Sequence, residues 1–341
     1  MRIKKLLENI NVNQVFYLTD PADMFYYSGF TGEGALIIGH DERMILTDGR
    51  YKEQAENETS FDVKTILNHL DTLKDLKKEI VVQKESLSYK MAEHFIKNGI
   101  KLEDTDIDFD CLRSVKDDTE IECLKKAADI SELALNKLLP HIKKGKTEKE
   151  LASLLDYFVK ESGGEKESFD TIFISGKNTS LPHGVPTNKQ IESGDFVTID
   201  FGTKYHGYCS DMTRTFAIEK ATDEMINVYN IVKRAQEKAE NGIKEGIELR
   251  TIDDLARDII NENGFGNYFI HSTGHGVGLK IHERPNLSPK SSGKLLQNQV
   301  VTVEPGIYIP DKFGVRIENT VLVKKDKGIP FQKFKKELII L

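Results

Sequence analysis

The most constraining feature of this sequence is a pair of carboxylates inside segments that are otherwise apolar. Residues 196–216, FVTIDFGTKYHGYCSDMTRTF, contain two apolar-rich runs separated by the turn-like TKYHG, which predicts a β-hairpin. Asp200 lies in the first run and Asp211 in the second. Aspartate is depleted in strands, and a buried carboxylate is costly unless it is paired or binds a metal. Because two such groups on facing strands raise each other's pKa, we expect a cation between them.

Three more polar groups occur in similar surroundings. Glu304 ends the apolar run QVVTV, Glu318 interrupts the run GVRIENTVLV, and His275 lies in the glycine-rich segment TGHGVG. Each position alone has an ordinary explanation, such as a hydrogen-bonded residue at a strand edge or in a turn. A chance set of all five in strand-like or glycine-rich segments is improbable, so we interpret them as one site.

The composition of this site indicates which metal it binds. Four carboxylates offset the charge of two divalent cations. A site rich in hard oxygen, with one imidazole and no thiolate, suits Mn²⁺ and admits Co²⁺, Fe²⁺ or Zn²⁺. Two metal ions roughly 3.5–4 Å apart activate a water and stabilise both attacking and developing oxygens. We therefore predict two divalent metal ions per chain, with Mn²⁺ preferred, and hydrolytic chemistry.

Composition excludes several other classes of protein. The net charge of -7 and the pI near 5.8 disfavour a non-specific nucleic-acid binder. No apolar run approaches the roughly 20 residues that span a bilayer, and the first residues lack the apolar core of a signal peptide. The three cysteines have no C-x-x-C spacing, which disfavours a zinc–thiolate site. We expect a cytoplasmic protein with neither a nucleic-acid nor a membrane partner.

The pattern of apolar residues predicts two domains. The first third alternates strands with helices: strands are expected at 14–19, 34–39, 43–48, 79–83 and, less clearly, 61–67, and a helix at 88–99. Helices follow at 119–142 and, after a capping-box spacing, at 150–164. Strands dominate from residue 168, with helices near 223–241 and 251–263. The polar stretch RSVKDD at 113–118 breaks the apolar pattern, so we place the domains at 1–114 and 115–341.

Five motifs resemble one known family. TIDFG, YCSDMTRTF, TGHGVGLKIHERP, VTVEPGIY and GVRIENT resemble the pita-bread metallopeptidases, which include methionine aminopeptidase, aminopeptidase P and prolidase. Residues 23–54 resemble the amino-terminal domain of aminopeptidase P and prolidase, and the likeness covers nearly the whole chain. It implies an α/β creatinase-like domain followed by an α+β pita-bread (creatinase/aminopeptidase-like) catalytic domain. It also implies a homodimer that hydrolyses the peptide bond preceding proline, in Xaa-Pro dipeptides or at the amino terminus of longer peptides.

The resemblance assigns a role to each metal ligand. It implies that Asp200 chelates one ion and that His275 binds the other. Asp211 and Glu318 would bridge both ions. Glu304 would bind metal and also handle the proton of the attacking water.

The resemblance also implies four residues around the metals. His183 would face the leaving nitrogen, and His282 would stabilise the tetrahedral intermediate. His271 would line the proline pocket, and Arg316 would support the metal site from the strand face that also carries Glu318. Structural explanations stay open for each: a turn residue, a core histidine or a plain salt bridge.

Two other functions stay open from the sequence. A methionine or broad-specificity aminopeptidase would share the fold, but the amino-terminal domain argues against it. A non-catalytic pita-bread binding protein would also share it, but the intact ligand set argues against that. The sequence does not separate a dipeptidase from an aminopeptidase, because the depth of the pocket decides between them.

Overall fold

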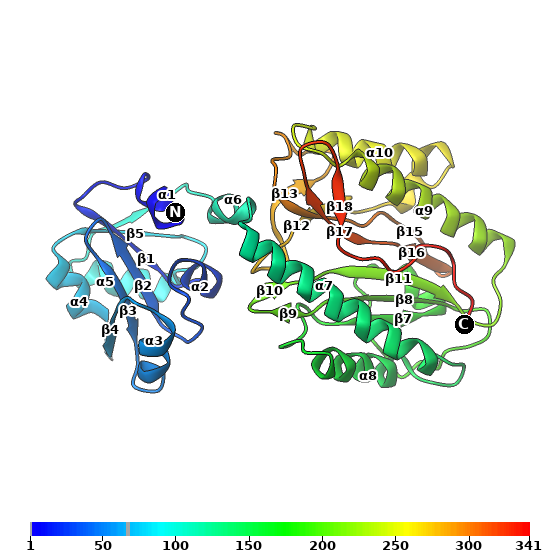
Figure 1. Cartoon of the computed structure of the whole chain (residues 1–341), viewed down its shortest axis with the longest axis horizontal. Coiled ribbons are helices and arrows are strands. Elements are labelled where there is room, and N and C mark those ends of the chain that lie inside the picture. The colour runs from blue at the N-terminus through cyan, green and yellow to red at the C-terminus, as the bar shows by residue number, and fades with distance from the viewer. Residues whose placement is uncertain (1, 66–68) are drawn as a thin grey trace. The chain divides into compact units, whose positions relative to one another are not determined.

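The computed structural model describes residues 2–65 and 69–341, which form two compact units, Met1–Leu112 and Arg113–Leu341 (Figure 1). The unit boundary lies between Leu112 and Arg113, whereas the sequence pattern places the domain boundary between residues 114 and 115. A strand is expected at 61–67, and its last two residues, 66 and 67, lie outside the described residues. In the described part of the chain, no helix is long and apolar enough to cross a membrane.

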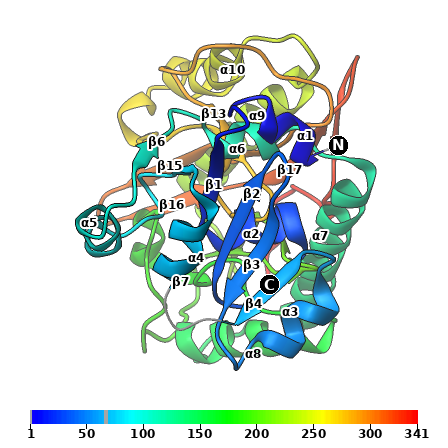
Figure 2. The same ribbon diagram turned by 90° about the vertical axis from the view of Figure 1, so that its left-hand side faces the viewer.

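The first unit is an α/β structure built on one mixed sheet. Within the described residues its strand order is β4-β3-β2-β1-β5-β6, and Figure 2 shows β4 to β1 side by side. β1 is antiparallel to β2 and parallel to β5. The strands are β1 (Gln14–Leu18), β2 (Ala35–Gly39), β3 (Arg43–Thr47), β4 (Asp62–Thr65), β5 (Glu79–Val82) and β6 (Leu102–Asp104). The helices are α1 (Arg2–Leu7), α2 (Pro21–Ser28), α3 (Lys52–Glu58), α4 (His69–Leu76) and α5 (Tyr89–Lys97), and α6 (Phe109–Ser114) includes the unit boundary.

Three of the four α-helices described in the second unit, α7 (Asp118–Leu138), α8 (Glu148–Glu161) and α9 (Asp223–Gly242), begin at a side-chain cap. The fourth is α10 (Leu249–Glu262). Asp117 with Glu120 forms a complete capping box on α7, and Thr147 with Glu150 forms one on α8. Such boxes satisfy backbone N–H groups that have no partner inside the helix. The helices expected in this half of the chain are confirmed.

The strands of the second unit form two main sheets. One has the order β11-β8-β7, from β7 (Ile172–Ser175), β8 (Phe196–Phe201) and β11 (Met212–Ala217). The other has the order β13-β12-β14-β17-β18, from β12 (Gly274–Gly276), β13 (Glu283–Leu287), β14 (Val300–Val303), β17 (Asn319–Val323) and β18 (Gly328–Pro330). β9 (Lys204–Tyr205) pairs with β10 (Tyr208–Cys209), and β15 (Gly306–Ile309) pairs with β16 (Phe313–Arg316). Short 3₁₀ turns lie at η1 (Leu139–His141), η2 (Gly176–Ser180) and η3 (Gly266–Tyr268).

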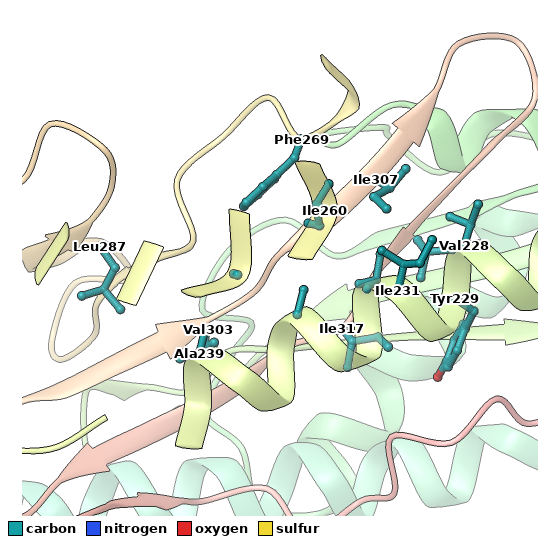
Figure 3. Packing of buried hydrophobic residues seen from close by; sticks show 14 of the residues in the cluster. Val228, Tyr229, Ile231, Ala239, Ile260, Phe269, Leu287, Val303, Ile307 and Ile317 are labelled. Carbon is teal, nitrogen blue, oxygen red and sulfur yellow. The ribbon is translucent and has the colours of Figure 1, made fainter. Parts of the chain in front are cut away.

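Apolar packing covers the strands of this unit from two sides. One core cluster joins α7 and α8 to β7, β8 and β11. The other joins α9 and α10 to β14 through β17, and Figure 3 shows Val228, Ile260 and Ile317 among its buried side chains. Figure 1 shows α9 and α10 along one side of the strands and α8 along the other. Each such side chain contributes about 1.5–3 kcal/mol when fully buried, so the strands between are firmly held.

The predicted hairpin forms, but one of its carboxylates lies elsewhere than expected. Its tip is a tight turn at His206 and Gly207, both with positive φ, and Asp200 lies in β8 as predicted. Asp211 directly precedes β11 rather than lying inside it. The reason is that its carbonyl accepts hydrogen bonds from the side chains of Thr320 and Gln332, each at 2.9 Å, in place of a strand partner.

Candidate metal centre

Five separate parts of the second unit bring the predicted ligands together. Carboxylate oxygens of Asp200, Asp211 and Glu318 all lie within 4.8 Å of one another. His275 Nε2 lies 3.6 Å from Asp211 Oδ2 and 3.3 Å from Glu304 Oε1. These side chains come from β8, the residue before β11, the turn between β16 and β17, β12 and the residue after β14. The structure therefore places all five predicted ligands in one connected cluster.

Two oxygens of this cluster have no hydrogen-bond donor. Among the described residues, Asp200 Oδ1 and Glu318 Oε1 are buried without a partner. Buried polar atoms are almost always hydrogen-bonded, and an ionised carboxylate oxygen in such a place is especially costly. A bound cation removes that cost, so the donor set fits divalent metal ions of the oxygen-preferring kind.

The ring of His275 is also oriented so that it can bind a metal ion. Its Nδ1 lies 3.0 Å from the carbonyl oxygen of Gly276, which can only accept, so Nδ1 carries the proton. In the neutral ring Nε2 then has a lone pair facing the oxygens of Asp211 and Glu304. A lone pair and two carboxylates repel unless a cation lies between them. Either a second proton or a metal ion must therefore occupy this position.

The charges of the cluster lead to the same conclusion. Burial raises the pKa of Asp211 and of Glu318, and the neighbouring carboxylates raise it further. Burial also opposes ionisation of Glu304, but the hydrogen bond and charge of His275 outweigh it and lower the pKa of Glu304 to about 2. Three closely spaced carboxylates thus compete for positive charge, which two divalent ions would supply.

Arg316 lies directly beside the cluster, as its position on the strand predicts. Its Nη2 donates to Asp200 Oδ2 at 2.5 Å, and its Nη1 donates to the hydroxyl of Tyr308 at 2.6 Å. That hydroxyl lies 2.9 Å from Nε2 of His271, whose Nδ1 donates to the carbonyl of Ser272 at 2.8 Å. The Tyr308 hydroxyl therefore accepts from Arg316 and donates to His271. Tyr308 was not among the predicted site residues, because a tyrosine in a strand is ordinary.

The other two predicted histidines, His282 and His183, are exposed residues. The ring of His282 is exposed, and its centroid lies 4.4 Å from that of His275. His183 is exposed on the segment after η2. Burial lowers the pKa of both His271 and His282, and the charge of His275 lowers the pKa of His282 further.

Threonines and glycines around the cluster hold the ligands in place. The threonines were not among the predicted site residues. Thr213 donates to Glu318 Oε2 at 2.6 Å, and the hydroxyl of Thr302 accepts from the backbone of His275 at 3.1 Å. A Cβ atom at Gly274 would lie 2.0 Å from a backbone oxygen of Thr302, and one at Gly276 would lie 2.2 Å from that of Arg284. The glycines beside His275 therefore permit close packing of neighbouring strands.

Two buried carboxylates outside the cluster hold the segments that carry His271 and His282. Asp253 accepts from the backbone N–H of Thr273 at 3.1 Å and forms a two-bond ion pair with Arg257. Glu283 accepts from the N–H groups of residues 279 and 280 and from Lys116 Nζ at 2.8 Å. No pattern in the sequence distinguishes these carboxylates from surface ones.

Comparison with known proteins identifies the family of this chain. Residues 122–325 match "Metallopeptidase family M24", and residues 2–115 match "Creatinase/Prolidase N-terminal domain". The chain is 38% identical over 348 residues to a Xaa-Pro dipeptidase of Pyrococcus furiosus, covering 99% of each protein.

Solved structures agree with this likeness. A Xaa-Pro dipeptidase of Bacillus anthracis superposes with a TM-score of 0.95 at 38% identity, covering 100% of this chain and 98% of that one. An X-Pro aminopeptidase of Thermotoga maritima superposes with a TM-score of 0.92 at 36% identity, covering all of both chains. The predicted fold, an α/β amino-terminal domain followed by a pita-bread catalytic domain, is confirmed. The chain belongs to metallopeptidase family M24 and carries the creatinase/prolidase type of amino-terminal domain.

Proposed function

We propose that this enzyme hydrolyses the peptide bond preceding proline, in Xaa-Pro dipeptides or at the amino terminus of Xaa-Pro peptides. The observation that carries the proposal is the buried cluster of Asp200, Asp211, Glu318, His275 and Glu304, with its two oxygens that lack a donor. The names of the relatives, Xaa-Pro dipeptidase and X-Pro aminopeptidase, supply the class of substrate.

The five residues of the cluster are proposed to hold two divalent ions, with Mn²⁺ preferred and Co²⁺, Fe²⁺ or Zn²⁺ admitted. Such ions, when bound, make hydroxide available near neutral pH and offset negative charge that develops on the substrate. Asp200 would contact one ion and His275 the other, while Asp211 and Glu318 would bridge. Arg316 keeps Asp200 in place through its 2.5 Å ion pair.

The remaining residues act on protons and hydrogen bonds. Glu304 would accept the proton of the attacking water and pass it toward the proline nitrogen. His282 would donate to the oxygen that becomes negative as the carbonyl is attacked. His183 would face the leaving nitrogen, and His271 would line the proline pocket. Because the acylated nitrogen of proline carries no hydrogen, the enzyme must recognise the proline ring itself.

Relatives bear both dipeptidase and aminopeptidase names, so both activities are candidates. The experiment compares Met-Pro, Met-Pro-Ser and Met-Ala-Ser as substrates of the Mn²⁺-loaded protein and identifies the products. We expect methionine to be released from the proline substrates and little from Met-Ala-Ser. Cleavage of Met-Pro alone identifies a dipeptidase, and cleavage of both proline peptides an aminopeptidase. Equal rates on Met-Ala-Ser and Met-Pro-Ser would refute the proposal and favour the methionine or broad-specificity alternative. A homodimer and a cytoplasmic location stay predictions of the sequence.

A further inference from the structure

The segment that carries His183 is held at both ends by one carboxylate that the mechanism does not use. Glu148, the first residue of α8, is fully buried. We propose that Glu148 is a positioning residue for His183, through the hydrogen bonds that it accepts from both ends of residues 175–187. The inference rests on the proposed function, in which His183 faces the leaving nitrogen.

Donors from both ends of the segment converge on Glu148. Its Oε1 accepts from the backbone N–H and the hydroxyl of Ser175, at 2.7 and 2.9 Å, and from the amide of Asn178 at 3.0 Å. Its Oε2 accepts from the N–H and the hydroxyl of Thr187, at 2.9 and 2.6 Å. Ser175 ends β7, and Thr187 lies beyond His183. One side chain thus closes the base of the loop.

Capping of α8 does not explain this carboxylate. The capping box of Thr147 and Glu150 already satisfies the first turn of the helix. All five donors to Glu148 are neutral groups, and the helix amino terminus favours its negative charge. The side chain is therefore oriented toward the loop, where hydrogen bonds to a charged group are stronger than those between neutral groups.

The rest of the loop shows why such a hold matters. Its middle is tied to the metal side of the unit, because Thr179 accepts from Gly314 N at 2.8 Å and the carbonyl of Pro182 accepts from Arg316 at 3.2 Å. Near His183, by contrast, Leu181 and Val185 are 55% and 76% exposed. Apolar packing of these two side chains therefore does not fix the tip, and its position depends on polar contacts, among them those that Glu148 makes at the base of the loop.

The test replaces Thr187 by valine, which keeps the volume and removes the hydroxyl donor at 2.6 Å. We expect kcat on Met-Pro to fall about tenfold, as loss of one bond to a charged group implies, with KM and metal content little changed. Thr147→Val is the matched control, because it removes a cap at the same end of α8 without touching the loop. It should leave kcat unchanged. In a His183→Ala background, Thr187→Val should cause no further loss.

Hydrogen exchange of the metal-free protein gives a readout that does not depend on substrate. Exchange at residues 175–187 should quicken in Thr187→Val and stay unchanged in Thr147→Val. The inference is wrong if the two variants lose equal activity, if Thr187→Val keeps wild-type kcat, or if it lowers kcat equally with and without His183. Failure of the wild-type enzyme to cleave any proline substrate would instead overturn the proposed function, and exchange would still decide whether Glu148 orders the loop.

Discussion

Glu304 and His282 both contact His275, but only Glu304 lies close to its Nε2 atom. Glu304 Oε1 is 3.3 Å from His275 Nε2, whereas His282 makes only a ring contact with His275. Replacing Glu304 by alanine should therefore remove one metal ion per chain together with activity. Replacing His282 by alanine should keep both ions, leave KM nearly unchanged and lower kcat by about 10²–10³, as loss of one oxyanion donor does. Metal analysis beside kinetics checks both. Loss of metal from His282→Ala would contradict the ligand assignment.

Tyr308 supplies the hydroxyl that joins Arg316 to His271. Tyr308 is buried, and Tyr308→Phe removes the hydroxyl that donates to Nε2 of His271. We expect the free energy of unfolding to fall by about 1–3 kcal/mol, the usual cost of an unsatisfied buried group, with metal content unchanged. Urea unfolding measures it, with the exposed Tyr157→Phe as control. An unchanged midpoint would show that the contact contributes nothing.

Which residues could be predicted depends on contrast with their surroundings. Asp200 and Glu318 are visible in the sequence because a carboxylate is unusual in an apolar run, and the structure brings both into the cluster. The sequence alone does not reveal the importance of Tyr308, Thr213 and Glu148. Tyrosine and threonine are common in strands, and glutamate is common at helix starts. Their importance comes from partners distant in the sequence.

At the scale of elements, a buried ion pair holds the segment before β13. Glu283 and Lys116 have side chains at most 1% exposed, and their charged atoms lie 2.8 Å apart. Lys116→Met should lower the free energy of unfolding by about 1–3 kcal/mol, because Glu283 loses one buried counter-charge and keeps Arg113 Nε at 3.3 Å. Lys146→Met, which breaks an i,i+4 pair with both side chains 53% exposed, should cost under about 1 kcal/mol. Equal midpoints in urea for the two variants would contradict this difference.

The helices α7 to α10 and strands such as β8 followed from local patterns, but the ends and pairings of the elements depended on distant contacts. The capping box at Thr147 and Glu150 is readable from the sequence, and it forms. The position of Asp211 outside β11 is not readable, because Thr320 and Gln332 supply the hydrogen bonds that replace its strand partner. Periodicity carries information about the face of an element and none about such partners.

At the scale of the whole molecule, every proposed ligand belongs to the unit Arg113–Leu341. Removing metal leaves mutually repelling carboxylates in a buried site, so the chelated protein should unfold at a lower temperature. Each ion adds about 2.7 kcal/mol at a concentration a hundred times its Kd. Calorimetry with EDTA and with added Mn²⁺ measures the shift, and the Asp211→Asn variant should show a smaller one. Identical melting temperatures with and without metal would contradict the prediction that metal binding stabilises the folded protein.

The central claim is that hydrolysis requires two metal ions bound together at the five-residue cluster. The most direct measurement is a titration of metal-free protein with Mn²⁺, following bound metal per chain and hydrolysis of Met-Pro in the same samples. We predict no turnover without metal, and activity that rises until two ions are bound per chain and then levels off. Full turnover by rigorously metal-free protein, or saturation of metal binding with no hydrolysis of any proline substrate, would contradict the account.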